Sequence, residues 1–234
     1  MDTAAPTPTP VRSEDTRQRL AALCALGWLG APAVILMMLK NLADEIDARI
    51  CDSPHSRVMA AWAARIAQEM NLSPQSAWRA MTAARVHDVG KVIVPEDILI
   101  ASGPLSDDEW DLIRKHPAEG RRLLSHVPEL AEVARIVGQH HERFDGCGYP
   151  SRLSNDDIAV EARIVSVCDA WAAMRAHRPY RAALDVEASR AELRAGAGRQ
   201  FHPEVVEAFL SLEATGEVGL LYGSAERGDV RRTA

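Results

Sequence analysis

Apolar residues recur at helical spacing along most of the chain. A clear example runs over Val34, Met38, Leu42 and Ile46, which lie four residues apart and therefore on one face of an amphipathic helix. The later apolar runs have the same helical character, and none alternates apolar and polar residues over the length of a strand. The pattern predicts an all-α fold.

Helix start signals precede several of these runs. Ser53 and Ser73 are each followed by proline, so each offers an N-cap hydroxyl before a residue suited to the first helical position. Ser106 and Glu109 have the spacing of a capping box. Helices are therefore predicted to begin at these three serines. Further helices are predicted from Pro128, over about 157–174 and over about 204–212.

Several of these helices carry histidines near their ends. The helix that follows Ser73 is expected to run to His87 and to stop at Gly90, because glycine commonly terminates a helix. The capping-box helix is expected to carry His116 in its last turn. The helix after it is expected to carry His140 and His141 on its apolar stripe.

The chain is expected to hold one folded domain between two tails. Residues 1–19 are rich in Pro, Thr and Ala and have no apolar period, which predicts a disordered tail. Residues 34–213 contain the predicted helices and are expected to form the domain. Residues 214–234 are polar and contain glycine, which predicts a flexible tail.

An uncharged segment covers residues 20–39, of which residues 20–33 precede the predicted domain. Its length reaches the lower bound for a membrane span. Gly27, Gly30 and Pro32 interrupt it and favour a buried hairpin or a helix that forms a homodimer. A membrane anchor is the alternative. A secretory signal is excluded because the preceding segment is long and contains three acidic residues.

Composition and charge narrow the functional classes. The 234 residues include 33 acidic and 27 basic side chains, for a net charge of −6. This balance argues against duplex nucleic acid as a partner, because no excess of cations is present to neutralise phosphates. The four cysteines form no CxxC pair, so neither a zinc ribbon nor a disulfide framework is indicated. Such cysteines fit a reducing compartment and predict a cytoplasmic protein.

Histidines and aspartates stand out as candidate metal ligands. Seven of them lie on or beside the apolar stripes of different predicted helices: His55, His87, Asp88, His116, His140, His141 and Asp169. Buried imidazoles and carboxylates are costly unless they are paired or bind a metal, and facing helices of a bundle build metal sites in this way. Nitrogen and oxygen ligands without thiolate suit Fe, Mn, Co, Ni or Zn. Seven ligands exceed the needs of one ion, so the set predicts two ions and the hydrolysis of a phosphate ester.

Two motifs resemble a known family. Residues 87–91, HDVGK, resemble the HDxGK signature of the HD superfamily of metal-dependent phosphohydrolases. Residues 140–150, HHERFDGCGYP, resemble the HHExxDGxGYP signature of its HD-GYP subgroup, which consists of bacterial cyclic di-GMP phosphodiesterases. The resemblance covers about 33–212 and implies an HD-domain helical bundle with an HD-GYP C-terminal extension. Further matching blocks contain His55, His116, Asp169, Arg178, Arg181 and Gly198.

The resemblance also implies roles for individual residues. The seven histidines and aspartates would bind two divalent ions, Fe or Mn in the first place, with Asp88 and Asp169 as the carboxylates that are shared or central. Asp88 and Lys91 would be the catalytic residues. Lys91, Arg178 and Arg181 would bind phosphate oxygens of the substrate. The mouth that binds guanine would be shaped by Gly148, Tyr149 and Pro150. The same loop would contact GGDEF-domain proteins.

The predicted activity is the hydrolysis of cyclic di-GMP, through pGpG, to GMP in bacterial second-messenger signalling. Two alternatives stay open: a catalytically weak or inactive module that binds a nucleotide or a partner, and an HD hydrolase of another cyclic dinucleotide. Departures from the family pattern favour a slow enzyme. Cys51 replaces a Glu of members with a third metal, Ala172 and His202 each replace an Asp, and Val58 and Met59 replace Arg and Val.

Overall fold

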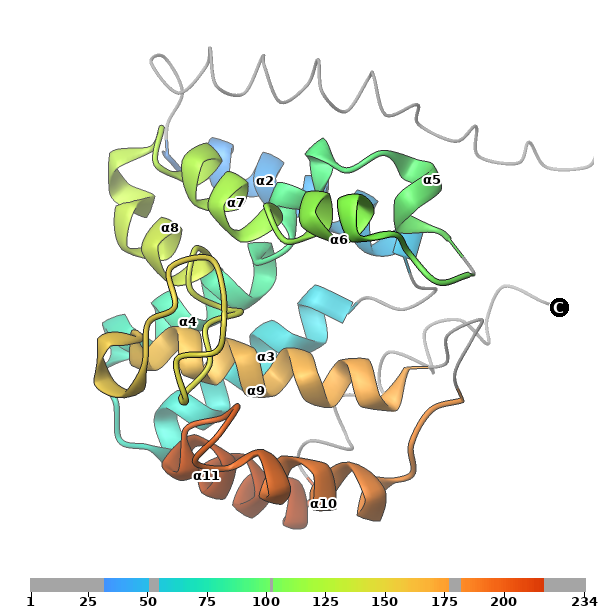
Figure 1. Ribbon diagram of the computed structural model, residues 1–234. Helices are drawn as coiled ribbons and strands as arrows, with labels where there is room; N and C mark the ends of the chain where they lie inside the picture. The colour runs from blue at the N-terminus through green and yellow to red at the C-terminus, as the bar shows by residue number, and fades with distance from the viewer. Residues whose placement is uncertain (1–31, 51–54, 102, 177–181, 217–234) are drawn as a thin grey trace, which may run out of the picture.

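The computed structural model describes residues 32–50, 55–101, 103–176 and 182–216 (Figure 1). In this part of the chain helices are joined by loops, and an isolated bridge between Ala197 and Phe201 is the only β-pairing. The prediction of an all-α fold is confirmed. The α-helices are α2 (Pro32–Ile50), α3 (His55–Glu69), α4 (Pro74–Val86), α5 (Glu96–Leu99), α6 (Asp107–Ile113), α7 (His116–Leu124), α8 (Ala131–Val137), α9 (Val160–Arg175), α10 (Val186–Gly196) and α11 (Pro203–Ala214). The 3₁₀ helices are η1 (Val89–Ile93), η2 (Pro128–Leu130) and η3 (Asn155–Asp157).

Several predictions concern residues outside the described ranges. These are the tail over 1–19, most of the apolar segment over 20–33, the start signal at Ser53 and the chain beyond residue 216. The first described helix, α2, begins at Pro32. Among the helices of the described ranges, none is both long and apolar enough to cross a membrane.

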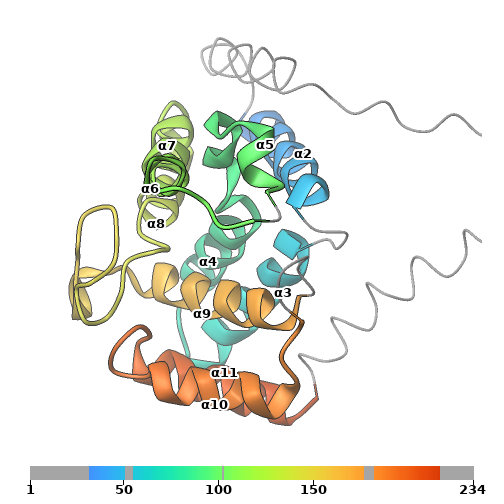
Figure 2. The same ribbon diagram turned by 45° about the vertical axis from the view of Figure 1, so that its right-hand side comes forward.

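Figures 1 and 2 show the helices in three tiers. The central tier consists of α3, α4 and α9, which pack against one another. On one side α10 and α11 contact α9, and α11 also contacts α3. On the other side lie α2, α5, α6, α7 and α8. The chain leaves α4 at His87 and Asp88 and enters η1, which contacts both α2 and α7. That turn is where the central tier meets the α7 side.

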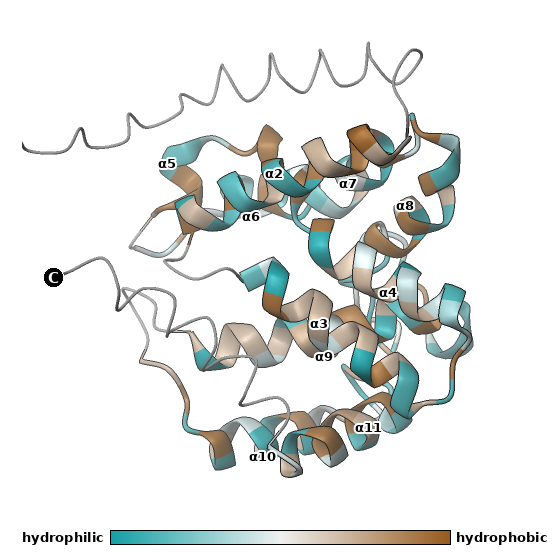
Figure 3. Ribbon diagram, turned by 180° about the vertical axis from the view of Figure 1, so that it is seen from behind, coloured by the Kyte–Doolittle hydropathy of each residue, from teal (hydrophilic) through white to brown (hydrophobic). Residues whose placement is uncertain are grey.

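Large aromatic side chains connect the central tier to α11. Phe209 of α11 lies between Trp62 of α3 and Trp171 of α9, with ring centroids 6.1 and 5.0 Å apart. All three side chains are buried, and burying a ring of this size stabilises the fold by roughly 2–3 kcal/mol. In Figure 3 hydrophilic and hydrophobic residues both occur along most helices, as expected for helices that bury one face.

Two of the predicted helix starts have the expected hydrogen bonds. The Ser73 hydroxyl accepts a hydrogen bond from the backbone N–H of Ser76 at 3.1 Å, at the start of α4. Ser106 and Glu109 form the predicted capping box at the start of α6, where the backbone N–H of Ser106 donates to Glu109 Oε2 at 2.7 Å. Each bond satisfies an amide that has no partner within its own helix.

The predicted role of Gly90 as a helix stop is wrong. Helix α4 ends at Val86, and Gly90 lies inside η1. Position 90 requires glycine because the backbone of η1 lies against the backbone of α7 there. A Cβ on Gly90 would lie 1.9 Å from the carbonyl oxygen of His116 and 2.6 Å from the backbone nitrogen of Gly120. Gly90 therefore allows η1 to pack directly against the first turns of α7.

The predicted positions of three histidines within helices also need correction. Helix α6 ends at Ile113, and His116 begins α7 instead of closing the preceding helix. Proline at the next position favours this start, because its missing N–H would have no partner in a first turn. Helix α8 ends at Val137, so His140 and His141 lie in the turn that follows it and not on its stripe.

Besides the short α5 and a separate α7, the sequence patterns missed the helix α10. It is strongly polar, and only Ser189 and Leu193 are buried, so its apolar stripe is too short to stand out. A start signal was present: the Asp185 carboxylate caps the helix by accepting a hydrogen bond from the backbone N–H of Ala188 at 2.7 Å.

Candidate metal centre

The seven candidate ligands come together where the central tier meets the α7 side. Six of them form two groups, and within each group the ligand atoms lie within 4.8 Å of one another. The first group comes from α3, from the turn after α4 and from α9: His55, His87 and Asp169. The second comes from α7 and from the turn after α8: His116, His140 and His141.

Asp88 lies between the two groups. Its Oδ2 is 3.3 Å from His87 Nε2 in the first group, and its Oδ1 is 3.3 Å from His116 Nε2 in the second. The side chain is almost fully buried. Each oxygen of one carboxylate therefore faces a different group, which is the position of a ligand shared by two ions.

Three of the histidine rings are oriented in the same way. Nδ1 of His87 contacts the carbonyl oxygen of Ala84 at 2.9 Å, and His116 and His140 make the same contact with the carbonyl three residues earlier, at 2.7 and 2.6 Å. A carbonyl oxygen only accepts, so Nδ1 carries a proton in each ring, and whenever the ring is neutral the lone pair is on Nε2. The acceptors lie near the C-terminal ends of α4, α6 and α8, where carbonyl groups lack helical partners.

The buried polar atoms of this cluster fit a metal centre. Nε2 of His116 and Nε2 of His140 lie 3.1 Å apart, and both carry lone pairs, which repel each other unless a cation lies between them. Within the described part of the chain, His87 Nε2 and Asp88 Oδ1 are buried and form no hydrogen bond. Burying a polar or charged atom without a partner lowers the stability of the fold, unless the atom binds a metal ion or a hydrogen-bonding group. Imidazole and carboxylate ligands suit divalent ions such as Fe, Mn or Zn.

His87 differs in charge from the histidines of the second group. Burial lowers the pKa of His116, His140 and His141 to about 3, so these rings are neutral near pH 7. Burial also disfavours a proton on His87, but the neighbouring Asp88 carboxylate outweighs it and raises the pKa of His87 to about 9. The second group is therefore ready to bind a cation, whereas His87 has to lose a proton first.

Both carboxylates of the cluster are ionised. Burial opposes the charge on Asp88, yet His87 and Lys91 hold the pKa of its carboxyl well below the usual range. Burial likewise opposes the charge on Asp169, while the hydrogen bond from His55 and the charge of His87 lower the pKa of that carboxyl. His55 Nε2 lies 3.4 Å from Asp169 Oδ1. Ionised carboxylates are the form that binds divalent ions.

A loop over residues 146–150, here called the GYP loop, covers one side of the second group. The Tyr149 ring stacks on His141 with centroids 4.9 Å apart, and its backbone N–H donates to the His141 carbonyl at 3.2 Å. A side chain at Gly148 would collide with the backbone of this turn, because a Cβ there would lie 2.4 Å from Arg143 N. Pro150 is exposed. The loop therefore holds the His141 ring in place.

The candidate cations lie in different parts of the chain. Lys91 Nζ lies 2.6 Å from Asp88 Oδ2, at the edge of the ligand cluster. Arg178 and Arg181, which the resemblance assigns to phosphate binding, lie outside the described residues. Of the proposed phosphate-binding residues, Lys91 is thus the one that the structure places beside the ligands.

The HD-domain family matches residues 35–205, a range that contains all seven candidate ligands and the GYP loop. The chain belongs to the HD-domain family. The resemblance drawn from the HDVGK and HHERFDGCGYP motifs is confirmed.

Proteins similar in sequence to this HD domain are named as phosphodiesterases of cyclic dinucleotides. A 3'3'-cGAMP-specific phosphodiesterase of Vibrio cholerae is 37% identical over 176 residues, which cover 74% of this chain and 34% of the relative. A cyclic di-GMP phosphodiesterase of Thermotoga maritima is 40% identical over 151 residues, covering 64% and 41%. A cyclic di-GMP phosphodiesterase of Pseudomonas aeruginosa is 30% identical over 251 residues, covering 93% and 59%. The chain thus spans between about a third and three fifths of the length of these relatives.

Solved structures have the same fold. An HDG"Y"P protein, Bd1817 from Bdellovibrio bacteriovorus, superposes with a TM-score of 0.57 at 19% sequence identity, over 87% of this chain and 65% of that one. A cyclic GMP-AMP specific phosphodiesterase of Vibrio cholerae also gives a TM-score of 0.57, at 15% identity, over 78% and 49%. Both likenesses show the HD-domain helical fold.

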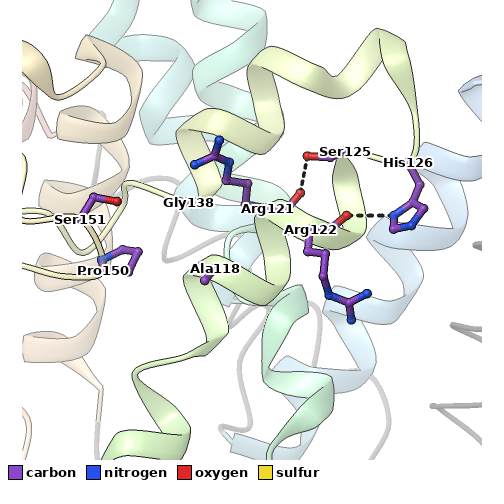
Figure 4. Close-up of a pocket in the computed structure, with 8 residues that line it drawn as sticks. All are labelled: Ala118, Arg121, Arg122, Ser125, His126, Gly138, Pro150 and Ser151. Carbon is purple, nitrogen blue, oxygen red and sulfur yellow. Dashed lines mark hydrogen bonds between the residues drawn. The ribbon is translucent and has the colours of Figure 1, made fainter.

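The HD domain has a cavity of about 600 Å³ along α7. Figure 4 shows it between α7 and the part of the chain that holds Pro150 and Ser151. Arg121 lines it from α7, and the Ser125 hydroxyl on the same wall donates to the carbonyl of Arg121 at 2.7 Å. Pro150 of the GYP loop lines this cavity and none of the seven candidate ligands does, so the cavity is separate from the ligand cluster.

Glu142, to which the sequence assigned no role of its own, fixes the chain that follows the GYP loop. Its buried carboxylate accepts hydrogen bonds from the backbone N–H groups of Ser151 at 2.6 Å and Leu153 at 3.0 Å. These bonds fold the chain back after the GYP loop, so that Tyr149 lies over His141. The sequence feature that could have indicated this role is an acidic residue directly after the histidine doublet.

Proposed function

We propose that the chain is a metal-dependent phosphodiesterase that hydrolyses a cyclic dinucleotide, with cyclic di-GMP as the first candidate substrate and GMP, formed through pGpG, as the final product. The observation that carries the proposal is the position of Asp88, whose two oxygens each lie 3.3 Å from a histidine of a different ligand group. Relatives named as cyclic di-GMP phosphodiesterases support the substrate class.

Two divalent ions, with iron or manganese as the first candidates, fit this set of residues. When bound, such ions stabilise charge on phosphate oxygens and activate water for attack on phosphorus. His55, His87 and Asp169 would hold one ion and His116, His140 and His141 the other, with Asp88 shared. The two carboxylates offset only part of the charge of two divalent ions, so the loaded site attracts an anionic phosphodiester.

The chain's own side chains would place the substrate. Lys91, now bound to Asp88, lies close enough to the ligands to move its ammonium onto a phosphate oxygen. Arg178 and Arg181 would bind the second phosphate. Burial raises the pKa of the Tyr149 phenol above its usual range, so the ring stays neutral and does not repel an anion. With Gly148 and Pro150 as neighbours, Tyr149 would shape the mouth for guanine.

A second candidate substrate is 3'3'-cGAMP. A relative named as specific for it is 37% identical to this chain, a figure similar to that of the cyclic di-GMP phosphodiesterases. Both dinucleotides contain guanine and two phosphodiester bonds, so the same ligand cluster and loop would serve either. The choice between them depends on residues that contact the second base.

A substrate panel tests the activity. The Mn²⁺-loaded protein is incubated with cyclic di-GMP, 3'3'-cGAMP and cyclic di-AMP, and the products are separated by chromatography. Linear dinucleotide followed by mononucleotide is expected from a guanine-containing substrate. Absence of product from all three with Mn²⁺ and with Fe²⁺ would overturn the enzymatic proposal. Tight binding of cyclic di-GMP without turnover would instead favour the binding module that Ala172 suggests.

We also propose a contact between the GYP loop and GGDEF-domain proteins, because Cys147 and Pro150 are exposed on it. A pull-down with an isolated GGDEF domain tests the contact, and loss of binding after Pro150→Ala is the expected result. The homodimer through residues 20–33 stays a prediction, for which the molar mass in solution is the measurement.

A further inference from the structure

His55 is held in the ligand cluster differently from the other four histidines. The rings of His87, His116 and His140 are fixed through Nδ1, and His141 is fixed by stacking on Tyr149. In the described part of the chain, His55 makes neither kind of contact. Its ring faces Asp169, and its backbone begins α3. The position of His55 therefore depends on how the first turn of α3 is held.

The first turn of α3 is held by a carboxylate from another helix. Asp47 of α2 accepts a hydrogen bond from the backbone N–H of Ser56, the residue next to His55, at 2.8 Å. Asp47 and Ser56 are 4% and 1% exposed, so this bond is shielded from water. Amides in a first helical turn lack partners within the helix, and a carboxylate is a favourable acceptor there. Asp47 thus caps α3 from α2.

A second helix fixes the side chain of the same residue. Arg85, near the end of α4, donates from Nη1 to the Ser56 hydroxyl at 2.5 Å and from Nη2 to Asp44 Oδ1 at 2.6 Å. Asp44 in turn accepts two hydrogen bonds from Arg57, at 3.0 and 2.6 Å. Ser56 is therefore fixed through its backbone by α2 and through its hydroxyl by α4.

The charges of this network balance within it. Asp44 and Asp47 supply two negative charges, and Arg57 and Arg85 supply two positive ones. Arg85 is 8% exposed, so its guanidinium is held among these partners instead of facing water. Such an arrangement has no surplus charge to attract a ligand. Its effect is to fix the geometry of α2, α3 and α4 beside His55.

We propose that Asp47 is a positioning residue for the metal centre: by capping α3 it places His55 and sets the metal affinity of the group formed by His55, His87 and Asp169. The other group does not depend on it, because His116, His140 and His141 come from α7 and from the turn after α8. A change at Asp47 is therefore expected to weaken the binding of one ion and to leave the binding of the other unchanged. The inference rests on the metal centre proposed above.

Metal titration of a cap variant tests this inference. Metal-free wild-type protein and the Asp47→Ala variant are titrated with Mn²⁺, and free Mn²⁺ is measured by its electron paramagnetic resonance signal. The variant is expected to lose on the order of 10–100-fold in affinity for one of two ions, as for other residues that orient a ligand, with the second ion unchanged. Asp47→Asn keeps an acceptor oxygen and is expected to restore most of the affinity.

The matched control is Asp185→Ala. Asp185 caps α10 through the same kind of bond, from the backbone N–H of Ala188 at 2.7 Å, and α10 carries none of the seven candidate ligands. Both alanine variants are expected to lower the melting temperature of the metal-free protein. Only Asp47→Ala is expected to change Mn²⁺ binding, which separates positioning from a general loss of stability.

Equal Mn²⁺ binding by wild type and Asp47→Ala would overturn the inference. If Asp47→Ala does not fold, Asp47→Glu decides, because it keeps the charge but displaces the acceptor by one methylene from the backbone N–H of Ser56 and is expected to weaken the binding of the same ion; unchanged affinity there overturns the inference too. Binding is measured without substrate. A wild-type protein that binds two ions but hydrolyses nothing would therefore refute the proposed function and leave this inference standing.

Discussion

At the scale of single residues, the histidines were predictable from the sequence but their surroundings were not. The motifs identified His87, His116 and His140, because residue type and spacing are visible in a sequence. The carbonyl groups that fix these rings are backbone atoms, and any residue three positions earlier would supply one. The proton position on each ring therefore followed only from the structure.

Asp88 is the residue on which the two ligand groups converge. Replacing it in Asp88→Asn keeps the shape of the side chain but removes the charge that two ions would share. Hydrolysis of the cyclic dinucleotide is expected to fall by more than about 100-fold, because even residues that only orient a ligand cost 10–100-fold. The rate and the metal content of the same sample are the measurements.

Asp111→Asn is the control for this substitution. Asp111 lies on α6, is strongly exposed and is paired with Arg114 at 3.2 Å. Its replacement is expected to leave the hydrolysis rate and the metal content unchanged. An Asp88→Asn variant as active as this control would show that Asp88 is not a ligand.

Gly90 allows the close packing of η1 on α7. In Gly90→Ala the new methyl group would collide with the carbonyl oxygen of His116, which is backbone and cannot move freely. We expect the free energy of unfolding to fall by about 1–3 kcal/mol, the usual cost of overpacking. Gly103→Ala serves as control, since nothing lies within 4 Å of a Cβ there, and it is expected to stay within about 0.5 kcal/mol of wild type. Urea denaturation measures both, and equal stability would contradict this account of Gly90.

At the scale of elements, helix existence was easier to predict than helix ends. Apolar period and capping residues identified α4 and α6 because both signals are local. The sequence did not separate α6 from α7, because a proline at 117 and a backbone contact at Gly90 decide where α7 begins. Helix α10 was missed because it buries only two side chains.

A buried carboxylate joins α9 to α4. Glu161 Oε1 accepts hydrogen bonds from the Ser76 hydroxyl at 2.6 Å and from Arg79 Nη2 at 2.7 Å. Burial opposes its ionisation, but these two partners hold the pKa of Glu161 below its ordinary value of 4.5. A carboxyl whose pKa is lowered by folding stabilises the fold above its unfolded pKa and loses that contribution as the pH falls through its folded pKa.

The expected result is a stability difference that depends on pH. Glu161→Gln should lower the free energy of unfolding by about 1–3 kcal/mol near pH 6.5, because it removes a charged acceptor from Arg79. The difference from wild type should shrink as the pH falls below about 4.5. Urea denaturation at pH 6.5 and 3.5 measures it, with the exposed Glu192→Gln of α10 as control. A difference that grows toward low pH would contradict the assignment.

At the scale of the whole molecule, the site exists only because separate tiers meet. His55 and Asp169 come from the central tier, whereas His116 and His140 come from α7 and the turn after α8. Periodicity cannot show that these helices face one another. The family resemblance supplied that information. Neither periodicity nor the resemblance could predict the contribution of α2 through Asp47, because it depends on a contact between residues that no motif contains.

Metal binding is therefore expected to hold the tiers together. Mn²⁺ at about 100 times its dissociation constant should stabilise the fold by about 2.7 kcal/mol, which corresponds to a rise in melting temperature on the order of 5–10 °C for a domain of this size. Calorimetry with Mn²⁺ and with a chelator measures the shift. Asp88→Asn should reduce it strongly, and an equal melting temperature with and without Mn²⁺ would show that the cluster does not bind this ion.

The most direct test of the central claim is to measure bound metal and turnover in the same sample. Metal-free protein is titrated with Mn²⁺ in the presence of cyclic di-GMP, and bound ions per chain are plotted against the rate of product formation. We predict that the rate stays low while the first ion binds and rises as the second ion binds, reaching its maximum at two ions per chain. A maximal rate at one ion per chain, or no product of cyclic di-GMP or 3'3'-cGAMP at two, would contradict the account.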